Sequence, residues 1–466
     1  MRRAVTSLLA LGVVAGAGVV CAPSAAADPV VEARTASPAN AVYTLDLSTP
    51  GGGRNWTGSE TVTFENTGAS ALEEVWFRLW ANGMTGCSDP GIVVSNVTGA
   101  IAAAPSVACT ALELSLPQPL SPGETATVTM DLAIRLPAAN GRFGWYQRTG
   151  RLGNAVPVLA VNDDEGWHLD PFFDSGESFY SLVGDWNVTL EVPADLGTPA
   201  TGALASATAL GHGREARVFV ARDVRDFAWE AGRFEHVRTR DEHGVIVRLW
   251  YRDGLLSDRR AGRLVRRSAG IMDTFSAAFG AYPYPEVDVV ITSFDLFSGM
   301  EYPQLVMTIP SPLVISHELA HQWWYGIVGD DQYEDPWIDE GFAQWSMYLP
   351  FSSSPNGWPP LPFVGCRMYD WPNDMVRLSS GVDYFDAHQE DYSIPYLQGA
   401  CALARLARDF GGLRPFLEVL HDYAAAHWFG VTTNADFMAA IAAAASDRGI
   451  DLDPATFFDR WRISRP

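Results

Sequence analysis

The chain has 466 residues, 47% of them hydrophobic, and a formal net charge of -23 at pH 7. This length exceeds one ordinary domain and supplies enough apolar side chain for at least two packed cores. The negative charge argues against sequence-independent binding to nucleic acid or to an anionic membrane, because both require a basic face. Lysine is absent, so no lysine-based nucleophile or base is available.

The first 27 residues have the three parts of a secretory signal peptide. Two arginines at positions 2 and 3 give a positive start, residues 8–20 form an apolar run, and three alanines at 25–27 form a small-residue exit. The run is too short for a membrane anchor, and nothing later is apolar for long enough to span a bilayer. We therefore expect a protein that is secreted, or held at the cell surface, with no integral membrane segment after signal removal.

Four cysteines follow this segment, at Cys87, Cys109, Cys366 and Cys401. An even number of cysteines in an exported chain predicts disulfides, and four cysteines allow three connectivities. We favour Cys87–Cys109 with Cys366–Cys401, because each pair then lies within one of the two domains proposed below.

Residues 28–41 predict a flexible N-terminus, and residues 42–243 predict a β-rich domain. In the second segment, short runs alternate between apolar and polar residues and are separated by Gly, Pro and Asn, which is typical of antiparallel strands with one buried face. The clearest runs are 42–47, 60–64, 74–79, 126–134 and 186–192. We expect a β-sandwich or saddle that serves as a scaffold or substrate-facing wall, because it holds no concentrated set of titratable residues.

Residues 244–466 predict an α+β domain. Residues 257–279 have apolar positions close to helical spacing, and Gly280 ends the run. Two strand-like runs and then a mainly helical remainder follow; the strands are 287–292 and 304–309, and the clearest helices are 396–410, 414–427 and 435–446. A small sheet followed by packed helices is an α+β arrangement.

A metal-binding pattern lies at the start of the helical part. His317 and His321 are four residues apart on a helix that Ser311 and Pro312 begin. Because four residues make just over one turn, both imidazoles project from one face and can bind one ion, with Glu318 beside it within reach of an attacking water. Two histidines do not complete a tetrahedral site, so a third ligand is required.

Glu340 is the expected third ligand. It lies nineteen residues after His321, on a helix that Asp335-Pro336 begins and Pro350 ends, which leaves enough chain to turn back to the ion. Two neutral imidazoles and one carboxylate leave a zinc centre with a net positive charge and one open position. The sequence therefore predicts one zinc ion, with Glu318 as the general base.

Residues 317–343, HELAHQWWYGIVGDDQYEDPWIDEGFA, resemble the aminopeptidase N and leukotriene hydrolase family of zinc peptidases, the gluzincins. The shared features are HExxH, eighteen intervening residues, Glu, and the flanking Trp and Glu-Gly-Phe-Ala. The resemblance covers nearly the whole mature chain and implies a thermolysin-like, mainly helical catalytic domain after the β-rich one. It also implies a short family form that lacks the C-terminal helical domain of many members, with a more open cleft.

The segment 297–302 resembles the family's Gly-x-Met-Glu-Asn loop. This resemblance implies that Gly299, Met300 and Glu301 bind substrate, with Glu301 at the free amino terminus of a peptide. An α-ammonium needs an anionic partner, which a carboxylate on a strand-edge loop supplies. The alternative for Glu301 is an exposed loop acid.

Residues 396–401 resemble the family's Tyr-x-Lys-Gly-Ala segment, which makes Tyr396 the counterpart of the tyrosine that hydrogen-bonds the oxyanion. A donor aimed at the developing oxyanion stabilises the transition state. The alternative is an aromatic residue of the core at a helix start, since Tyr384 and Tyr392 lie nearby in the sequence.

The chain departs from the family pattern at several positions. Tyr302 replaces the Asn after Met-Glu, Gln398 replaces a Lys, and Asp339 replaces the Asn before Glu-Gly-Phe. The β-rich segment has no clear equivalent of the Pro-x-x-Asp-Glu-Pro stretch that adds a second contact to the amino terminus in many members. The nearest candidates, 163–165 and Asp174, do not match it.

The leading hypothesis is a secreted zinc metallopeptidase that acts as an aminopeptidase on peptides. One alternative is an endopeptidase or broader peptidase that uses an open cleft. Another is a zinc-binding protein that has lost catalysis. Retention of Glu318 argues against this last alternative, because structural zinc sites need ligands but no adjacent base.

Overall fold

The computed structural model of the chain describes residues 36–351, 366, 371–372 and 374–464. These residues belong to one compact unit, Thr35–Pro466. The signal peptide and most of the expected flexible N-terminus lie outside the described residues. Within the described ranges, no helix combines the length and the apolar character that crossing a membrane requires.

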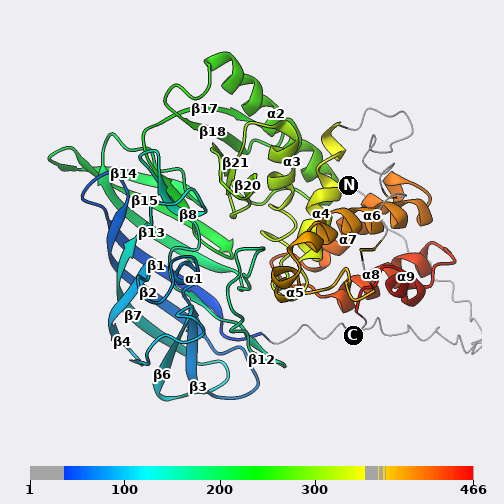
Figure 1. Cartoon of the computed structure of the whole chain (residues 1–466), viewed down its shortest axis with the longest axis horizontal. Helices are drawn as coiled ribbons and strands as arrows, with labels where there is room; N and C mark the ends of the chain where they lie inside the picture. The colour runs from blue at the N-terminus through cyan, green and yellow to red at the C-terminus, as the bar shows by residue number, and fades with distance from the viewer. Residues whose placement is uncertain (1–35, 352–365, 367–370, 373, 465–466) are drawn as a thin grey trace, which may run out of the picture. The chain divides into compact units, whose positions relative to one another are not determined.

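A seven-stranded sheet dominates the N-terminal half, with the strand order β14-β15-β13-β1-β2-β7-β4 (Figure 1). Its strands are β1 (Ala39–Ser48), β2 (Asn55–Glu65), β4 (Ile92–Thr98), β7 (Thr125–Arg135), β13 (Gly184–Pro193), β14 (Ala203–Gly211) and β15 (Arg214–Val224). Along β1, Tyr43, Leu45 and Leu47 are buried and alternate with exposed or half-buried residues. The period-two pattern thus gives one face to the core, as the sequence predicts.

Smaller sheets complete the β-rich half. A four-stranded sheet has the order β10-β3-β6-β5, a three-stranded sheet has the order β16-β9-β8, and β11 pairs with β12. Their bounds, with the short helix of this half, are β3 (Leu72–Arg78), β5 (Ile101–Ala102), β6 (Ala111–Leu120), β8 (Phe143–Tyr146), β9 (Thr149–Leu152), β10 (Val158–Leu159), β11 (Asn162–Asp163), β12 (Gly166–Trp167), β16 (Trp229–Ala231) and α1 (Ala81–Thr85). The five predicted runs are confirmed as β1, β2, β3, β7 and β13.

A five-stranded mixed sheet begins the second half, in the order β17-β18-β19-β21-β20. Its strands are β17 (Phe234–Arg240), β18 (Ile246–Arg252), β19 (Glu286–Ile291), β20 (Gly299–Met300) and β21 (Leu305–Thr308). β17 and β18 form an antiparallel hairpin, and the division expected after residue 243 falls in its turn. The exact domain boundary stays a prediction.

Helices make up most of the remaining described chain: α2 (Asp258–Phe279), α3 (Pro312–Ala320), α4 (Trp337–Ser346), α5 (Val382–Ala387), α6 (Ser393–Asp409), α7 (Leu413–Ala426), α8 (Asn434–Asp447) and α9 (Pro454–Arg460), with 3-10 turns at Leu349–Phe351 and Gln389–Asp391. The predicted order, β-rich and then mainly helical, is confirmed. One start differs: α4 begins at Trp337 with Pro336 as its N-cap, while Asp335 accepts a hydrogen bond from Asn434.

Both favoured disulfides are present. Cys87 is bonded to Cys109 in the β-rich half, and Cys366 is bonded to Cys401 on α6. The preference for pairs within one half of the chain is therefore confirmed.

Two adjacent tryptophans fix the end of α3. The indole nitrogen of Trp323 donates to the carbonyl of Gly280 at 2.9 Å, just beyond α2, and that of Trp324 donates to the hydroxyl of Ser346 on α4 at 3.0 Å. Both rings are almost fully buried. Since each indole has its donor satisfied, the pair holds α3 between α2 and α4 without an unpaired buried polar group.

Helices α4 and α6 approach closely at two glycines. A Cβ added at Gly341 would lie 2.9 Å from the Cα of Gly399, and one added at Gly399 would lie 2.7 Å from the Cα of Gly341. A side chain at either position would therefore force the two backbones apart. This contact brings Glu340 on α4 next to Tyr396 on α6.

An ionic link joins the β-rich half to the helical half. The Nε2 atom of His168 lies 3.0 Å from Asp163, and its Nδ1 atom lies 3.1 Å from Asp331, in the segment between α3 and α4. Burial alone would lower the pKa of His168, but hydrogen bonds to Asp331 and Asp163 outweigh it and raise the pKa to about 9. The imidazolium therefore bridges two carboxylates at neutral pH.

This link predicts a pH dependence of stability. Because the folded-state pKa of His168 exceeds the unfolded value of about 6.5, the stabilisation is complete below pH 6.5 and is lost as pH rises through 9. The melting temperature of the wild type should fall more steeply between pH 7 and pH 10 than that of His168→Gln. His421→Gln, at an exposed position on α7, is the control. Parallel curves for the wild type and His168→Gln would contradict the link.

Candidate metal centre

Three side chains from two helices converge on one point. The Nε2 atoms of His317 and His321 are 3.2 Å apart, and Glu340 Oε2 lies 3.1 Å from the first and 3.5 Å from the second. A tetrahedral zinc with bonds of 2.0–2.1 Å separates its ligand atoms by roughly 3.3 Å. The spacing of these atoms therefore fits a zinc ion without rearrangement.

The orientation of His321 is set by its other ring nitrogen. Nδ1 lies 3.1 Å from the carbonyl oxygen of Trp324, which can only accept a hydrogen bond, so Nδ1 carries the proton. In the neutral imidazole, the form that binds a metal ion, Nε2 is then left with its lone pair directed at the cluster. Asp339 Oδ2 lies 3.9 Å from the same Nδ1 and accepts a hydrogen bond from Gln332 at 2.7 Å. The departure from Asn at position 339 thus places a carboxylate behind this ligand.

The charge state of Glu340 suits a metal ligand. Burial would raise its pKa, but hydrogen bonding by His317 and His321 holds the pKa well below its usual range. The carboxylate is therefore ionised, and a cation placed between the three ligands would strengthen this tendency.

Tyr396 reaches the same carboxylate from α6. Its hydroxyl donates to Glu340 Oε1 at 2.7 Å, and its ring is stacked at 6.0 Å from that of His317. The two neighbouring tyrosines are engaged elsewhere, since the hydroxyl of Tyr392 donates to Glu177 and that of Tyr384 donates to Asp391. The structure therefore brings Tyr396, of these three, to the ligand cluster.

A cavity of about 670 Å³ opens beside the cluster. Most predicted site residues line it, whereas His321 lies behind its wall; the lining includes Gly299, Met300, Glu301, His317, Glu318, Glu340 and Tyr396. The β-rich half contributes Arg142 and the segment from Asp174 to Glu177. This half therefore forms a wall of the cavity, one of the two roles expected for it.

Glu318 faces the cavity from α3, and Gly299 on β20 makes room for it. A Cβ at position 299 would lie 2.0 Å from Oε1 of Glu318, so only glycine leaves space for that carboxylate. Burial and then the charge of Glu301 raise the pKa of Glu318 well above its usual value. A carboxylate with a raised pKa is better suited to accept a proton near neutral pH than an ordinary glutamate.

Glu301 follows β20 and is 6% exposed. Burial and then the neighbouring Glu177 raise its pKa to about 8. Glu301 is thus not an exposed loop acid, and its side chain lines the cavity; among the residues that the structure describes, no ion pair joins it to a cationic side chain. Two adjacent buried carboxyl groups favour a cationic ligand between them.

Glu177 lines the cavity and was not singled out from the sequence. Arg142 donates to its Oε1 at 2.9 Å, and Tyr392 donates to its Oε2 at 3.3 Å, so its carboxylate is held in place from both halves of the chain. It lies three residues after Asp174, in an irregular segment with no motif or period. The nearby Asp174 also lines the cavity, whereas residues 163–165 do not.

Tyr302, which stands where the family pattern has Asn, contacts the β-rich half. Its hydroxyl donates to Asn154 in the β-rich half at 2.8 Å, and Asn154 in turn donates to Asp226 at 2.9 Å. The side chain is buried and ties the segment that carries Glu301 to the β-rich wall.

Comparisons with known proteins agree with this geometry. Residues 266–461 match the family model of the peptidase family M1 domain. Human aminopeptidase N is 25% identical over 252 residues, which are 47% of this chain and 25% of that protein. The thyrotropin-releasing hormone-degrading ectoenzyme of Rattus norvegicus is 24% identical over 266 residues, which are 51% of this chain and 24% of that protein. The chain thus spans about a quarter of the length of these curated relatives.

Solved structures match over nearly the whole chain. An M1 zinc metallopeptidase from Deinococcus radiodurans has a TM-score of 0.67 at 20% identity, covering 93% of this chain and 94% of that one. A two-domain M1 zinc metallopeptidase mutant bound to L-arginine also has a TM-score of 0.67, at 21% identity, covering 93% and 95%. These matches show the same two-domain fold.

The contact between Gly299 and Glu318 gives a prediction. In Gly299→Ala the added methyl group displaces the Glu318 carboxylate but no metal ligand, so zinc content should be unchanged while kcat/KM for a peptide falls by roughly 10²-fold. Gly51→Ala, where the new Cβ meets no atom within 4 Å, is the matched control. Equal activity in the two variants would rule out the proposed dependence on the position of Glu318.

Proposed function

Since residues 266–461 belong to peptidase family M1, we propose that the chain is a zinc-dependent metallopeptidase that removes amino-terminal residues from peptides. One observation carries the proposal: a single cavity opens beside a zinc-compatible ligand cluster and is lined by two of its members, His317 and Glu340, together with three further acidic residues, Glu318, Glu301 and Glu177. His317, His321 and Glu340 would hold the ion. When bound there, zinc supplies Lewis-acid chemistry that acidifies water and polarises a carbonyl group.

Glu318 is the proposed general base. It is 4% exposed, lines the cavity beside the ligand cluster and is not itself one of the ligands. It takes a proton from the attacking water and passes it to the leaving amine. Burial keeps its pKa high enough to hold the proton between these two steps.

Tyr396 is the proposed oxyanion donor. Burial and then the charge of Glu340 raise its pKa well above the usual value, so the hydroxyl remains protonated and able to donate. Its present acceptor is Oε1 of a metal ligand, at 2.7 Å, so the hydroxyl already lies at the edge of the reaction centre. A donor at this place contributes roughly 3 kcal/mol when it points at developing negative charge.

Glu301 and Glu177 are the proposed anchors for the free amino group. An ammonium between them is attracted to both carboxylates, and its charge removes the repulsion that raises the pKa of Glu301. An internal peptide segment has no such charge and would leave Glu301 without a cationic ligand, whereas Glu177 would keep its contacts with Arg142 and Tyr392. This pair therefore favours cleavage at the amino terminus over internal cleavage.

Export is the remaining part of the proposal. The signal-peptide pattern of residues 1–27 and the two disulfides support a secreted or cell-surface location, since disulfides persist in oxidising compartments.

The role of Glu318 is testable by an isosteric change. Glu318→Gln should lower kcat by about 10²–10⁴-fold and retain about one zinc per chain, because the ligands are untouched. Glu418→Gln, an exposed substitution on α7, should behave as wild type. Peptide hydrolysis assays, zinc analysis and a chelator control give the answer. Full activity in Glu318→Gln would exclude it as the base, and a wild type that binds zinc but cuts no peptide would favour a binding protein.

The amine anchors are testable with blocked substrates. Wild type should cleave a free peptide at least about 10²-fold faster, by kcat/KM, than its N-acetylated form, because each buried carboxylate loses a charged partner. Glu301→Gln and Glu177→Gln should each reduce this ratio mainly through the free peptide. Glu73→Gln, exposed on β3, is the control. Equal rates on free and acetylated peptides would show an endopeptidase or broad peptidase instead.

A further inference from the structure

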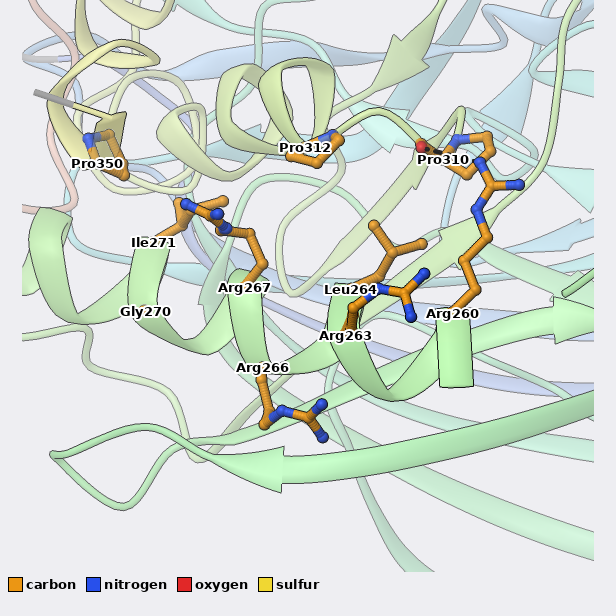
Figure 2. Close-up of a pocket in the computed structure, with 10 residues that line it drawn as sticks. All are labelled: Arg260, Arg263, Leu264, Arg266, Arg267, Gly270, Ile271, Pro310, Pro312 and Pro350. Atoms are coloured by element: carbon orange, nitrogen blue, oxygen red, sulfur yellow. Dashed lines mark hydrogen bonds between the residues drawn. The ribbon is translucent and has the colours of Figure 1, made fainter. Parts of the chain in front are cut away.

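A second cavity, of about 660 Å³, lies along the first half of α2. We call it the arginine groove and define it by Arg260, Arg263 and Arg267 on one side and by Pro310, Pro312 and Pro350 on the other. Figure 2 shows these arginines on the side of α2 that faces Pro310 and Pro312, whereas Arg266 points away. The groove is separate from the cavity beside the metal centre, and the two share no lining residue.

Helix α2 carries a cluster of arginines, although the protein as a whole has a large negative charge. Five of the chain's 32 basic residues fall between positions 259 and 267, although the net charge is -23. All five side chains belong to exposed residues. Within the described part of the chain, no ion pair joins Arg260, Arg263 or Arg267 to a carboxylate.

This arrangement is unfavourable for the helix by itself. Arginines three or four residues apart, such as Arg260 with Arg263 and Arg263 with Arg267, repel each other on the same face. Arg260 also lies in the first turn of α2, where the helix dipole disfavours positive charge. An anion in the groove would offset both effects.

Two of the three guanidinium groups contact other parts of the chain. Arg260 donates to the carbonyl of Pro310 at 3.5 Å, and the guanidinium of Arg267 lies 5.3 Å from the ring centroid of Phe351. Arg263 lies between them along the helix. With a rise of about 1.5 Å per residue, the three positions span roughly 10 Å, which is longer than one phosphate group.

The opposite wall limits the kind of ligand. Prolines have no backbone N–H, and the carbonyl of Pro310 already accepts from Arg260. These prolines offer a peptide strand no backbone donor, whereas a chain of phosphates needs only the donors that guanidinium groups supply in pairs. We infer that the arginine groove binds a linear phosphate polyanion, as a site independent of the peptidase chemistry.

Inorganic polyphosphate is the probe for this site. Wild type should bind it at about 50 mM salt, and the affinity should fall roughly twentyfold to fortyfold at 200 mM, as expected when about three phosphates are neutralised. The triple variant R260Q/R263Q/R267Q should lose at least tenfold in affinity. The control R222Q/R233Q/R414Q removes the same charge from exposed positions elsewhere and should lose less than threefold.

Melting curves test whether both triple variants are folded. If the groove triple variant does not fold, the single variant R263Q replaces it and should lose about threefold in affinity for polyphosphate. Equal loss in the groove triple and the control would overturn the inference, because it would indicate a general charge effect. If inorganic phosphate competed as well as polyphosphate at the same phosphorus concentration, the inference of a linear ligand would be overturned. Binding to phosphatidylglycerol vesicles but not to polyphosphate would also overturn it.

Discussion

Packing of α3 against α4 holds three candidate ligand atoms, from His317, His321 and Glu340, within 3.5 Å of one another. Trp324 provides one fixed point through its hydrogen bond to Ser346 on α4, and Trp323 attaches the same helix end to the chain beyond α2. The close contact of Gly341 with Gly399 then places α6 next to α4. The positions of Glu318 and Tyr396 depend on this packing of α3, α4 and α6. A displacement of either helix would therefore separate several groups at once.

The cavity beside these helices holds several buried acidic groups whose negative charges repel one another. Burial and mutual repulsion raise the pKa values of Glu301 and Glu318, whereas the histidine ligands keep Glu340 ionised. In the proposed function, a divalent cation at the candidate ligands and an ammonium at Glu301 would relieve this repulsion at two separate points. The electrostatic repulsion in the cavity therefore supports the proposal of two cationic ligands. The β-rich half takes part in this balance, because Arg142 and Glu177 come from it.

The sequence predicted what depends on local spacing. Period-two runs located the main strands, and the four-residue interval of His317 and His321 placed both imidazoles on one side of a single helical turn. Both disulfides were also predicted, because each pair lies within one half of the chain. Glu177 was missed because its role depends on a long-range contact: Arg142 and Tyr392 hold it beside Glu301, and no local pattern marks a residue in an irregular segment. The start of α4 was misjudged by one residue because Asp335 bonds Asn434 rather than capping the helix.

X-ray absorption at the zinc edge of the purified, zinc-loaded protein tests the central claim most directly, because it reports the ligands themselves. The account predicts about one zinc per chain, nitrogen and oxygen ligands at 2.0–2.2 Å, and a clear imidazole signal. Glu340→Gln should weaken zinc binding while both imidazoles remain. Sulfur ligands, an all-oxygen shell, or an unchanged spectrum after replacement of both His317 and His321 would contradict the account.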